Sequence, residues 1–274
     1  MRNIVTLLFL IFMVTFRVIT RLSLKGEKHS PLKIGHRGAA GYCPENTFAS
    51  FNKALDLGVD YLEIDVQMTK DGELVVIHDT TVNRTTNGKG KGKVKDYTLK
   101  EIQNLDAGSW FDFKFTGEKI PSLSEFLDEF AGKVGILLEL KKPSLYPQIV
   151  EKTAEELIKR KLTTGDNQMI VQSFDRDSLK RFHELLPSIP IGVLVKNAGV
   201  KMITNKDLRS FTSYVSYVNP KITMVNKRLI KRIHHHGLKT IIWTVKKKNE
   251  VMTLKELHVE GIITDFPDLC EEID

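Results

Sequence analysis

From residue 32 to the end of the chain, short apolar segments alternate with longer stretches that have the apolar spacing of amphipathic helices. The apolar segments are residues 32–38, 61–66, 74–79, 135–141, 169–174, 189–195, 214–220, 240–245 and 261–265. The helical patterns include residues 45–58, 147–160, 176–186, 205–212, 226–236 and 247–257. This alternation is typical of an α/β protein with a parallel sheet that is buried on both faces. With about eight such strands in a chain of this length, we predict a TIM-type (β/α)8 barrel.

The composition is that of one large folded domain. The chain has 274 residues, of which 41% are apolar and 27% are charged. The apolar content suffices for a barrel-sized core, and the charged content excludes a disordered chain or a protein with many membrane spans. The net charge of +7 suits anionic partners such as phosphate substrates, an acidic membrane surface or nucleic acid, although solvated lysines alone can produce it.

One part of the chain departs from the alternation of strand and helix. Asp71-Gly72 stands between two strand patterns, and this pair is a strong signal for a two-residue β-hairpin loop. Such a loop pairs Lys70 with Glu73 and, further along the ladder, Asp65 with His78. The Gly/Lys-rich residues 80–120 that follow are expected to form an insertion near the strand ends, which makes the barrel irregular.

Five ionisable residues lie at or near the ends of the apolar segments: His36, Glu63, Asp65, His78 and Glu139. The carboxyl ends of barrel strands meet at one mouth, so these side chains are expected to converge. Three carboxylates are suitable ligands for one divalent cation, Mg²⁺ or Ca²⁺, and two imidazoles can act as general acid and base. We therefore favour a site that hydrolyses phosphoesters.

Basic and aromatic residues beside these five could bind the rest of a substrate. Arg37 and Lys141 are suited to contacts with a phosphate group. Trp243 and Phe174 line the alcohol side of the site or simply pack in the core, and Trp243 could hold a choline head group by a cation–π contact.

Each of these residues also has an ordinary structural explanation. The carboxylates of Glu63 and Asp65 could face solvent on an edge hairpin, and Glu139 could form a surface ion pair with Lys141. The histidines could be hydrogen-bonded core residues. Elsewhere, residues 234–236 (HHH) are expected to end a helix before Gly237, and Cys43 and Cys270 are expected to be free thiols, although the sequence leaves their pairing open.

The amino-terminal segment is the most apolar part of the chain. Residues 4–16 form an apolar run of 13 residues, shorter than the ~20 that span a bilayer, and Arg17 could lie near the end of a longer span over residues 4–24. No cleavage site of the A-x-A type follows, so we favour an uncleaved membrane anchor in residues 1–25 over a cleaved signal peptide. Arg and Lys residues after the run favour a cytoplasmic domain, whereas an export route would place it outside, so the side of the membrane stays open.

A set of motifs, in order along the chain, resembles the glycerophosphodiester phosphodiesterases. The motifs are HRGAAGYCPENTFASF (36–51), YLEIDVQMTKDGELVVIHD (61–79), ELK (139–141), QSF (172–174), WTV (243–245) and GIITDFPD (261–268). The resemblance covers about residue 32 to the end. It implies a TIM-barrel catalytic domain over residues 30–274, with the insertion after the strand that carries His78, and hydrolysis of glycerophosphodiesters to an alcohol and sn-glycerol 3-phosphate.

The resemblance also implies a role for individual residues. His36 and His78 match the general acid/base pair of the family. Glu63, Asp65 and Glu139 match its divalent-ion ligands, and Arg37 and Lys141 match its phosphate contacts. Two alternatives remain: a lysophospholipase D that acts on membrane lysolipids, and a membrane-tethered binding barrel without activity. The sequence has no nucleic-acid-binding motif, and it does not determine the head group or the oligomeric state.

Overall fold

The computed structural model describes residues 30–86, 88, 90–164, 168–196 and 203–271. Pro31–Asp274 form one compact unit. The proposed anchor in residues 1–25 lies outside the described residues. Within the described part of the chain, no helix is both long enough and apolar enough to cross a bilayer.

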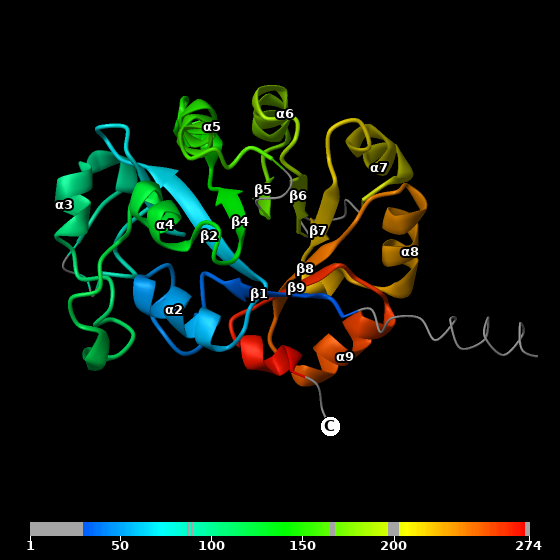
Figure 1. The fold of residues 1–274 in the computed structure, drawn as a ribbon, viewed down its shortest axis with the longest axis horizontal. Helices are drawn as coiled ribbons and strands as arrows, with labels where there is room; N and C mark the ends of the chain where they lie inside the picture. The colour runs from blue at the N-terminus through cyan, green and yellow to red at the C-terminus, as the bar shows by residue number, and fades with distance from the viewer. Residues whose placement is uncertain (1–29, 87, 89, 165–167, 197–202, 272–274) are drawn as a thin grey trace, which may run out of the picture. The chain divides into compact units, whose positions relative to one another are not determined.

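The centre of this unit is a barrel of eight parallel strands, which confirms the predicted fold class (Figure 1). The strands follow one another in the order β7, β6, β5, β4, β2, β1, β9, β8. Their bounds are β1 Leu32–His36, β2 Tyr61–Met68, β4 Gly135–Leu140, β5 Met169–Ser173, β6 Ile191–Val195, β7 Tyr217–Pro220, β8 Ile241–Val245 and β9 Gly261–Thr264. Between β7 and β8 only isolated bridges occur, Tyr217 with Lys239 and Lys221 with Trp243, so the barrel is nearly closed there.

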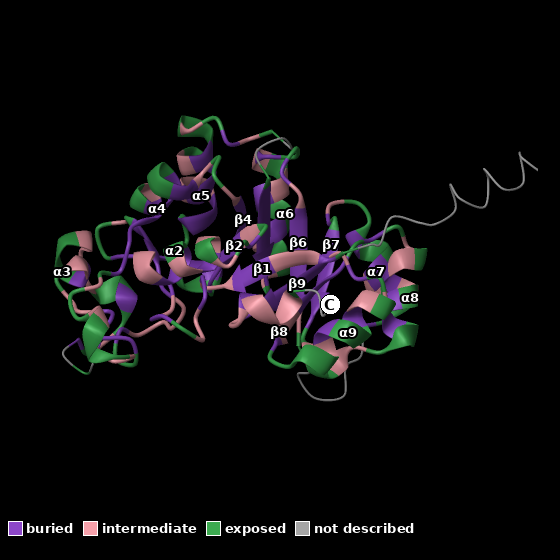
Figure 2. Ribbon diagram, turned by 60° about the horizontal axis from the view of Figure 1, so that its bottom comes forward, coloured by how far each residue is buried: buried purple, intermediate pink, exposed green. Residues whose placement is uncertain are grey.

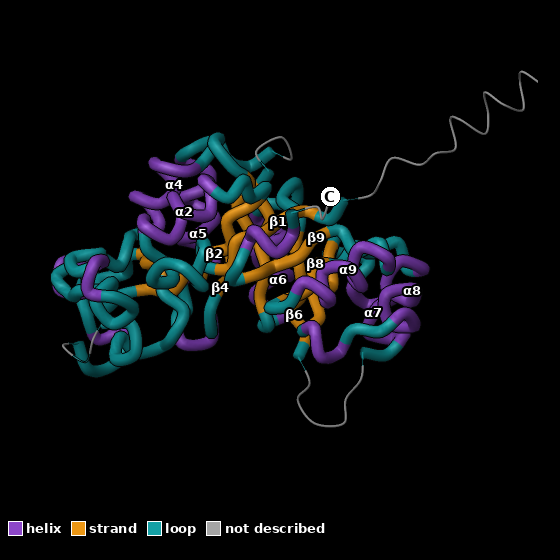
Figure 3. The backbone as a smooth tube through the Cα atoms, turned by 90° about the horizontal axis from the view of Figure 1, so that it is seen from below, coloured by secondary structure: helices purple, strands orange, loops and turns teal. Residues whose placement is uncertain are grey.

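Helices cover the outside of the barrel, and each buries one face against the strands (Figures 1, 2 and 3). They are α2 Phe48–Asp56, α4 Leu123–Phe130, α5 Ile149–Lys159, α6 Arg176–Leu185, α7 Asn205–Phe211, α8 Lys227–His235 and α9 Lys248–Glu256. In α6, Asp175 caps the first turn by accepting a hydrogen bond from the backbone of Ser178 at 2.8 Å, and Leu179 and Phe182 are fully buried.

The structure differs from the sequence prediction at two points, the hairpin that follows β2 and helix α4. The predicted pairing of Lys70 with Glu73 and of Asp65 with His78 is wrong by one residue, because β3 (Leu74–Val76) pairs with β2 so that Val66 faces Val76. The hairpin has a three-residue loop with Gly72 at φ +82°, a conformation that glycine adopts without strain. The ladder ends at Val76, so His78 lies beyond the paired strand.

The second difference is helix α4, which the sequence analysis did not include. Ser122 and Glu125 form a reciprocal capping box at its start, a signal that is visible in the sequence. Between β3 and α4 the described residues form the short helix α3 (Leu99–Gln103; Figure 1) and two 3-10 turns. This segment has an apolar cluster of its own. The cluster includes Val75 and Ile77, so it is continuous with the β3 hairpin.

The three histidines at residues 234–236 lie at the end of α8, as predicted, with Gly237 at φ +71° directly after them. The thiols of Cys43 and Cys270 are both free. Burial raises the pKa of Cys270 to about 11.

Three phenylalanine rings join α2 to α4 on the outside of β2. The ring centre of Phe126 lies 4.8 Å from that of Phe51 and 5.1 Å from that of Phe130, and all three side chains are fully buried. We expect Phe126→Ala to lower the free energy of unfolding by about 3–5 kcal/mol, since it leaves a cavity in this cluster. Urea denaturation measures the change. Phe113→Ala is the matched control, because Phe113 is 85% exposed and its loss should change stability by less than about 0.5 kcal/mol. Equal effects of the two substitutions would contradict this description of the core.

Candidate active site

Three carboxylates meet at the carboxyl end of the barrel because their strands are neighbours in register. His36, the last residue of β1, pairs with Glu63 of β2. Two residues further along β2, Asp65 pairs with Glu139 of β4. Side chains two apart on a strand share a face, so Glu63 and Asp65 point the same way. All three carboxylates are at least nine-tenths buried, which excludes the solvent-exposed interpretation of Glu63 and Asp65.

The carboxylate cluster of Glu63, Asp65 and Glu139 has the dimensions of a divalent-cation site. One oxygen from each residue lies within 4.8 Å of the others, and ligands of one Ca²⁺ at 2.3–2.6 Å are separated by at most about 5 Å. Burial, followed by the charges of Asp65 and Glu139, raises the pKa of Glu63 well above its ordinary value. Burial also raises the pKa of Glu139. Burial and mutual repulsion thus disfavour the ionised forms of Glu63 and Glu139, and a bound cation would favour them.

Two basic side chains, Lys141 and Arg37, partly neutralise the carboxylate cluster. The Nζ of Lys141 lies 2.8 Å from Glu139 and 3.4 Å from Asp65, and the Nε of Arg37 lies 3.2 Å from the other oxygen of Asp65. Burial opposes ionisation of Asp65, but Lys141 and Arg37 hold its pKa well below the ordinary range. The two residues that were predicted to contact phosphate thus lie beside the carboxylates, with further N–H groups left for a ligand.

The backbone at Arg37 is specialised for this position. Its φ is +55°, and its amide donates a hydrogen bond to Glu63 at 2.9 Å. A Cβ on the following Gly38, which has φ +88°, would lie 2.6 Å from the backbone of Ser50 in α2. The glycine therefore lets the β1–α2 turn pack against α2, which positions the Arg37 side chain at the carboxylate cluster.

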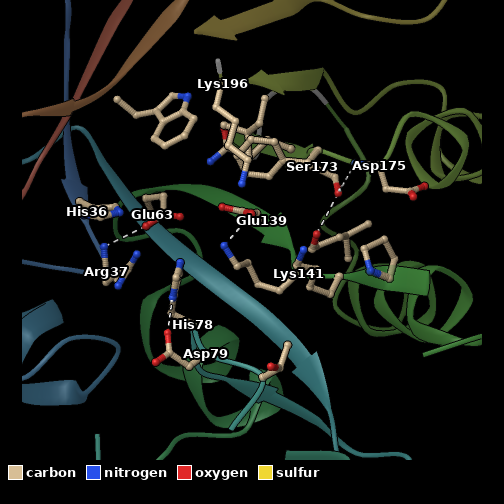
Figure 4. A pocket seen from close by; sticks show the side chains of 18 of the residues that line it. His36, Arg37, Glu63, His78, Asp79, Glu139, Lys141, Ser173, Asp175 and Lys196 are labelled. Atoms are coloured by element: carbon tan, nitrogen blue, oxygen red, sulfur yellow. Dashed lines mark hydrogen bonds and ion pairs between the residues drawn. The ribbon is translucent and has the colours of Figure 1, made fainter. Parts of the chain in front are cut away.

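Both histidines are held from behind by an aspartate, and Figure 4 shows this contact for His78 and Asp79. The Nδ1 of His36 lies 2.5 Å from Asp265, and the Nδ1 of His78 lies 2.7 Å from Asp79. The His78 hydrogen bond and Arg84 lower the pKa of Asp79. Burial opposes ionisation of Asp265, but its hydrogen bond and charge interaction with His36, together with Lys246, lower its pKa. Ionised carboxylates only accept hydrogen bonds, so each Nδ1 carries the proton and each Nε2 is left to face the cleft.

Ion pairs outside the cluster connect these groups further. Glu45 accepts hydrogen bonds from both Arg37 and Arg84, and Arg84 also contacts Asp79. Asn46 donates a hydrogen bond to Asp65 at 2.9 Å. Glu45, Asn46 and Arg84 received no role from sequence reasoning, although Glu45 and Asn46 lie inside the HRGAAGYCPENTF motif.

Sequence reasoning also assigned no role to Asp265, although a closed barrel predicts its place beside His36. In a closed barrel the first and last strands are neighbours, and here Gly35 pairs with Thr264. The next step along this register places Asp265 opposite His36. For Arg84, which comes from the irregular segment after β3, the sequence holds no comparable signal.

A cleft of about 790 Å³ opens above these residues. Of the eight residues predicted for the site, seven line it, and Asp65 lies behind them against Lys141 and Arg37. Trp243 lines the cleft with Phe174, and their ring centres are 5.6 Å apart in an edge-to-face arrangement. The Trp243 indole donates a hydrogen bond to the backbone of Asn219 at 2.7 Å, which fixes the ring.

Charge repulsion among the carboxylates has a measurable consequence for stability. We expect Glu63→Gln to raise the free energy of unfolding by about 1 kcal/mol in the presence of a chelator, because it removes a buried like charge from a site built for function. Saturating Mg²⁺ or Ca²⁺, at about 100 times its Kd, should stabilise the wild type by about 2.7 kcal/mol and the variant by less. Thermal denaturation measures both effects.

The control for this experiment is Glu73→Gln, which makes the same chemical change at an exposed position in the β2–β3 hairpin. It should leave stability and the response to cations unchanged. A Glu63→Gln protein that is less stable than the wild type in chelator, or a wild type that neither cation stabilises, would show that the cluster is not a cation site.

Comparison with known proteins agrees with this geometry. The sequence model of the Glycerophosphoryl diester phosphodiesterase family matches residues 36–269. The chain is 44% identical over 236 residues to YhdW of Bacillus subtilis (strain 168), covering 86% of this chain and 94% of that protein. It is 37% identical over 263 residues to the glycerophosphodiester phosphodiesterase of the same strain, covering 91% of this chain and 89% of that protein.

A solved structure extends the comparison to three dimensions. The structure of an Oleispira antarctica phosphodiesterase in complex with the product sn-glycerol-3-phosphate superimposes with a TM-score of 0.77 at 27% sequence identity. The match covers 87% of this chain and 94% of that one. The family match spans most of the chain, and it includes every residue of the carboxylate cluster and both aspartate-backed histidines. The chain therefore belongs to the glycerophosphoryl diester phosphodiesterase family.

Proposed function

We propose that this protein hydrolyses glycerophosphodiesters to an alcohol and sn-glycerol 3-phosphate, with a divalent cation and two histidines at the site described above. The observation that carries the proposal is the pairing of each histidine with an aspartate beside a buried cluster of three carboxylates. The relatives named glycerophosphodiester phosphodiesterase and the neighbour with bound sn-glycerol-3-phosphate support the substrate class.

Glu63, Asp65 and Glu139 would hold the cation. When bound, a divalent ion supplies positive charge that balances the phosphate and the negative charge that develops on its oxygens. Arg37 and Lys141 add to that charge from the protein side. Because both are already fixed by ion pairs with Asp65, they can bind a phosphate oxygen without losing much side-chain freedom. Separate addition of Mg²⁺ and Ca²⁺ in the product assay distinguishes the two ions.

The two histidines are suited to different halves of the proton transfer. Burial, followed by the charge of Arg37, lowers the pKa of His36, although Asp265 opposes the shift. His36 is therefore neutral near pH 7 and can accept a proton at Nε2 from the attacking hydroxyl group of the substrate. His78 would protonate the leaving alcohol from Nε2, a role that requires its imidazolium form with Nδ1–H held by Asp79. Water would then open the cyclic phosphate and yield sn-glycerol 3-phosphate, with the two histidines exchanging roles. Asp265 and Asp79 act as positioning residues that keep each Nε2 directed at the cleft.

The decisive experiment is a product assay on the purified full chain. We expect release of sn-glycerol 3-phosphate from a panel of glycerophosphodiesters, loss of that activity in chelator, and recovery on addition of Mg²⁺ or Ca²⁺. A lysophospholipid in the same panel tests the alternative activity as a lysophospholipase D. Full activity in metal-stripped protein would remove the cation from the mechanism.

Removal of either imidazole tests the proton-transfer roles. We expect His36→Ala and His78→Ala each to lower kcat by about 10²–10⁴-fold, the usual contribution of a general acid or base, with little change in the unfolding temperature. His183→Ala, in helix α6 away from the cleft, is the matched control and should retain activity. Near-wild-type turnover by either cleft variant would exclude that histidine from catalysis.

We also propose that the amino-terminal segment associates with a membrane, which rests on the apolar run at residues 4–16 alone. The full chain should float with phospholipid vesicles in a density gradient, whereas a double variant, Leu8→Asp with Leu10→Asp, should not, because charge in the apolar run is costly in a bilayer. Flotation of both proteins alike, or of neither, would contradict this role of the segment.

A further inference from the structure

The two halves of the cleft have different chemistry. The histidines, the carboxylate cluster and its cations come from the ends of β1, β2 and β4 and from the segment after β3. The opposite wall comes from the ends of β5, β6, β7 and β8. It contains two aromatic rings, Phe174 and Trp243, and two lysines, Lys196 and Lys221. If the first half holds the phosphate, as the proposed function requires, the second half faces the leaving alcohol.

The aromatic part of this wall is already paired with a cation of the protein. The Nζ of Lys196 lies 4.8 Å from the centre of the Phe174 ring, within the range of a cation–π contact. Phe174 packs edge-to-face on Trp243. The backbones of Lys221 and Trp243 form one of the isolated bridges between β7 and β8. Figure 4 shows Lys196 across the Glu63 and Glu139 carboxylates from His78. Lys196 thus contacts the Phe174 ring, and Lys221 is the cross-strand neighbour of Trp243.

These lysines lack the counter-charges that Arg37 and Lys141 have. Among the residues that the structure describes, no carboxylate oxygen lies within ion-pair distance of the Nζ of Lys196 or Lys221. Asp175 follows β5 in the same wall, but its carboxylate caps α6 through Ser178 at 2.8 Å, and Figure 4 shows it directed away from Lys196. The wall is therefore positively charged, and it is open to an anionic ligand.

We propose that Lys196 and Lys221 select diesters whose leaving alcohol carries a second anionic group, such as a phosphate monoester. This proposal rests on the proposed function and assigns the substrate class within it. A quaternary ammonium alcohol would find the Phe174 ring already occupied by an ammonium and would be repelled by both lysines. In this proposal the aromatic pair supports the lysines and contacts the carbon skeleton of the alcohol, whereas the sequence analysis expected Trp243 to hold a choline head group.

The test compares two substrates that differ by one group, glycerophosphoglycerol and the same diester with a terminal phosphate on the leaving glycerol. The measured quantity is the ratio of kcat/KM for the phosphorylated over the unphosphorylated substrate. We expect a wild-type ratio of about ten, reduced about three- to fivefold by Lys196→Gln and by Lys221→Gln, the range for a solvent-exposed ion pair. The ratio should also fall as salt is added.

Lys159→Gln is the control, since this exposed lysine ends α5 at the opposite end of the barrel and should leave the ratio and both rates unchanged. Lys196→Glu should reduce the ratio further than Lys196→Gln. A wild-type ratio near one, or equal ratios in the wild type and all lysine variants, would overturn this inference and leave the proposed function intact. Failure of the wild type to hydrolyse either diester with Mg²⁺ or Ca²⁺ would instead overturn the proposed function.

Discussion

The structure of the site depends on the balance of charge around three buried carboxylates. Asp65 is compensated by Lys141 and Arg37 and remains ionised, whereas Glu63 and Glu139 are only partly compensated and have raised pKa values. A barrel interior that was optimised for stability alone would be filled with apolar side chains at these positions. Three ionisable side chains at these positions fit the proposed cation site, and the remaining polar groups of the site surround them.

Alternating charges continue outward from this cluster. From Asp65 the ion pairs run through Arg37 to Glu45, then through Arg84 to Asp79 and the ring of His78. This chain links the β1 end of the cleft to the segment after β3, so the position of His78 does not depend on strand pairing. Each member contacts a charge of opposite sign, and the network runs from the buried Asp65 to the exposed Arg84.

Much of this arrangement could be predicted from the sequence, for identifiable physical reasons. Glu63, Asp65 and Glu139 were found because strand periodicity and parallel neighbours are regular, so that residues at strand ends must meet. The hairpin register was wrong by one residue, since Asp71-Gly72 suits both a two-residue loop and the three-residue loop that Gly72 closes. Helix α4 was overlooked despite its Ser122–Glu125 capping box. Arg84, Lys196 and Lys221 were not identified, because they follow irregular segments or strand ends whose direction no local pattern determines.

The incompletely paired boundary between β7 and β8 has a consequence for how the specificity of such a protein can evolve. The β2 and β4 strands, which carry Asp65 and Glu139, are joined along six consecutive residue pairs, whereas β7 and β8 touch only at isolated bridges. Lys221 and Trp243 form one of those bridges. If the β5–β8 half of the cleft binds the leaving alcohol, as proposed, substitutions at this boundary would change the preference for the alcohol while the well-paired strands keep Asp65 and Glu139 in place. Preference for one alcohol and the capacity to cleave the ester would then be structurally separable properties of this barrel, and each could evolve without the other.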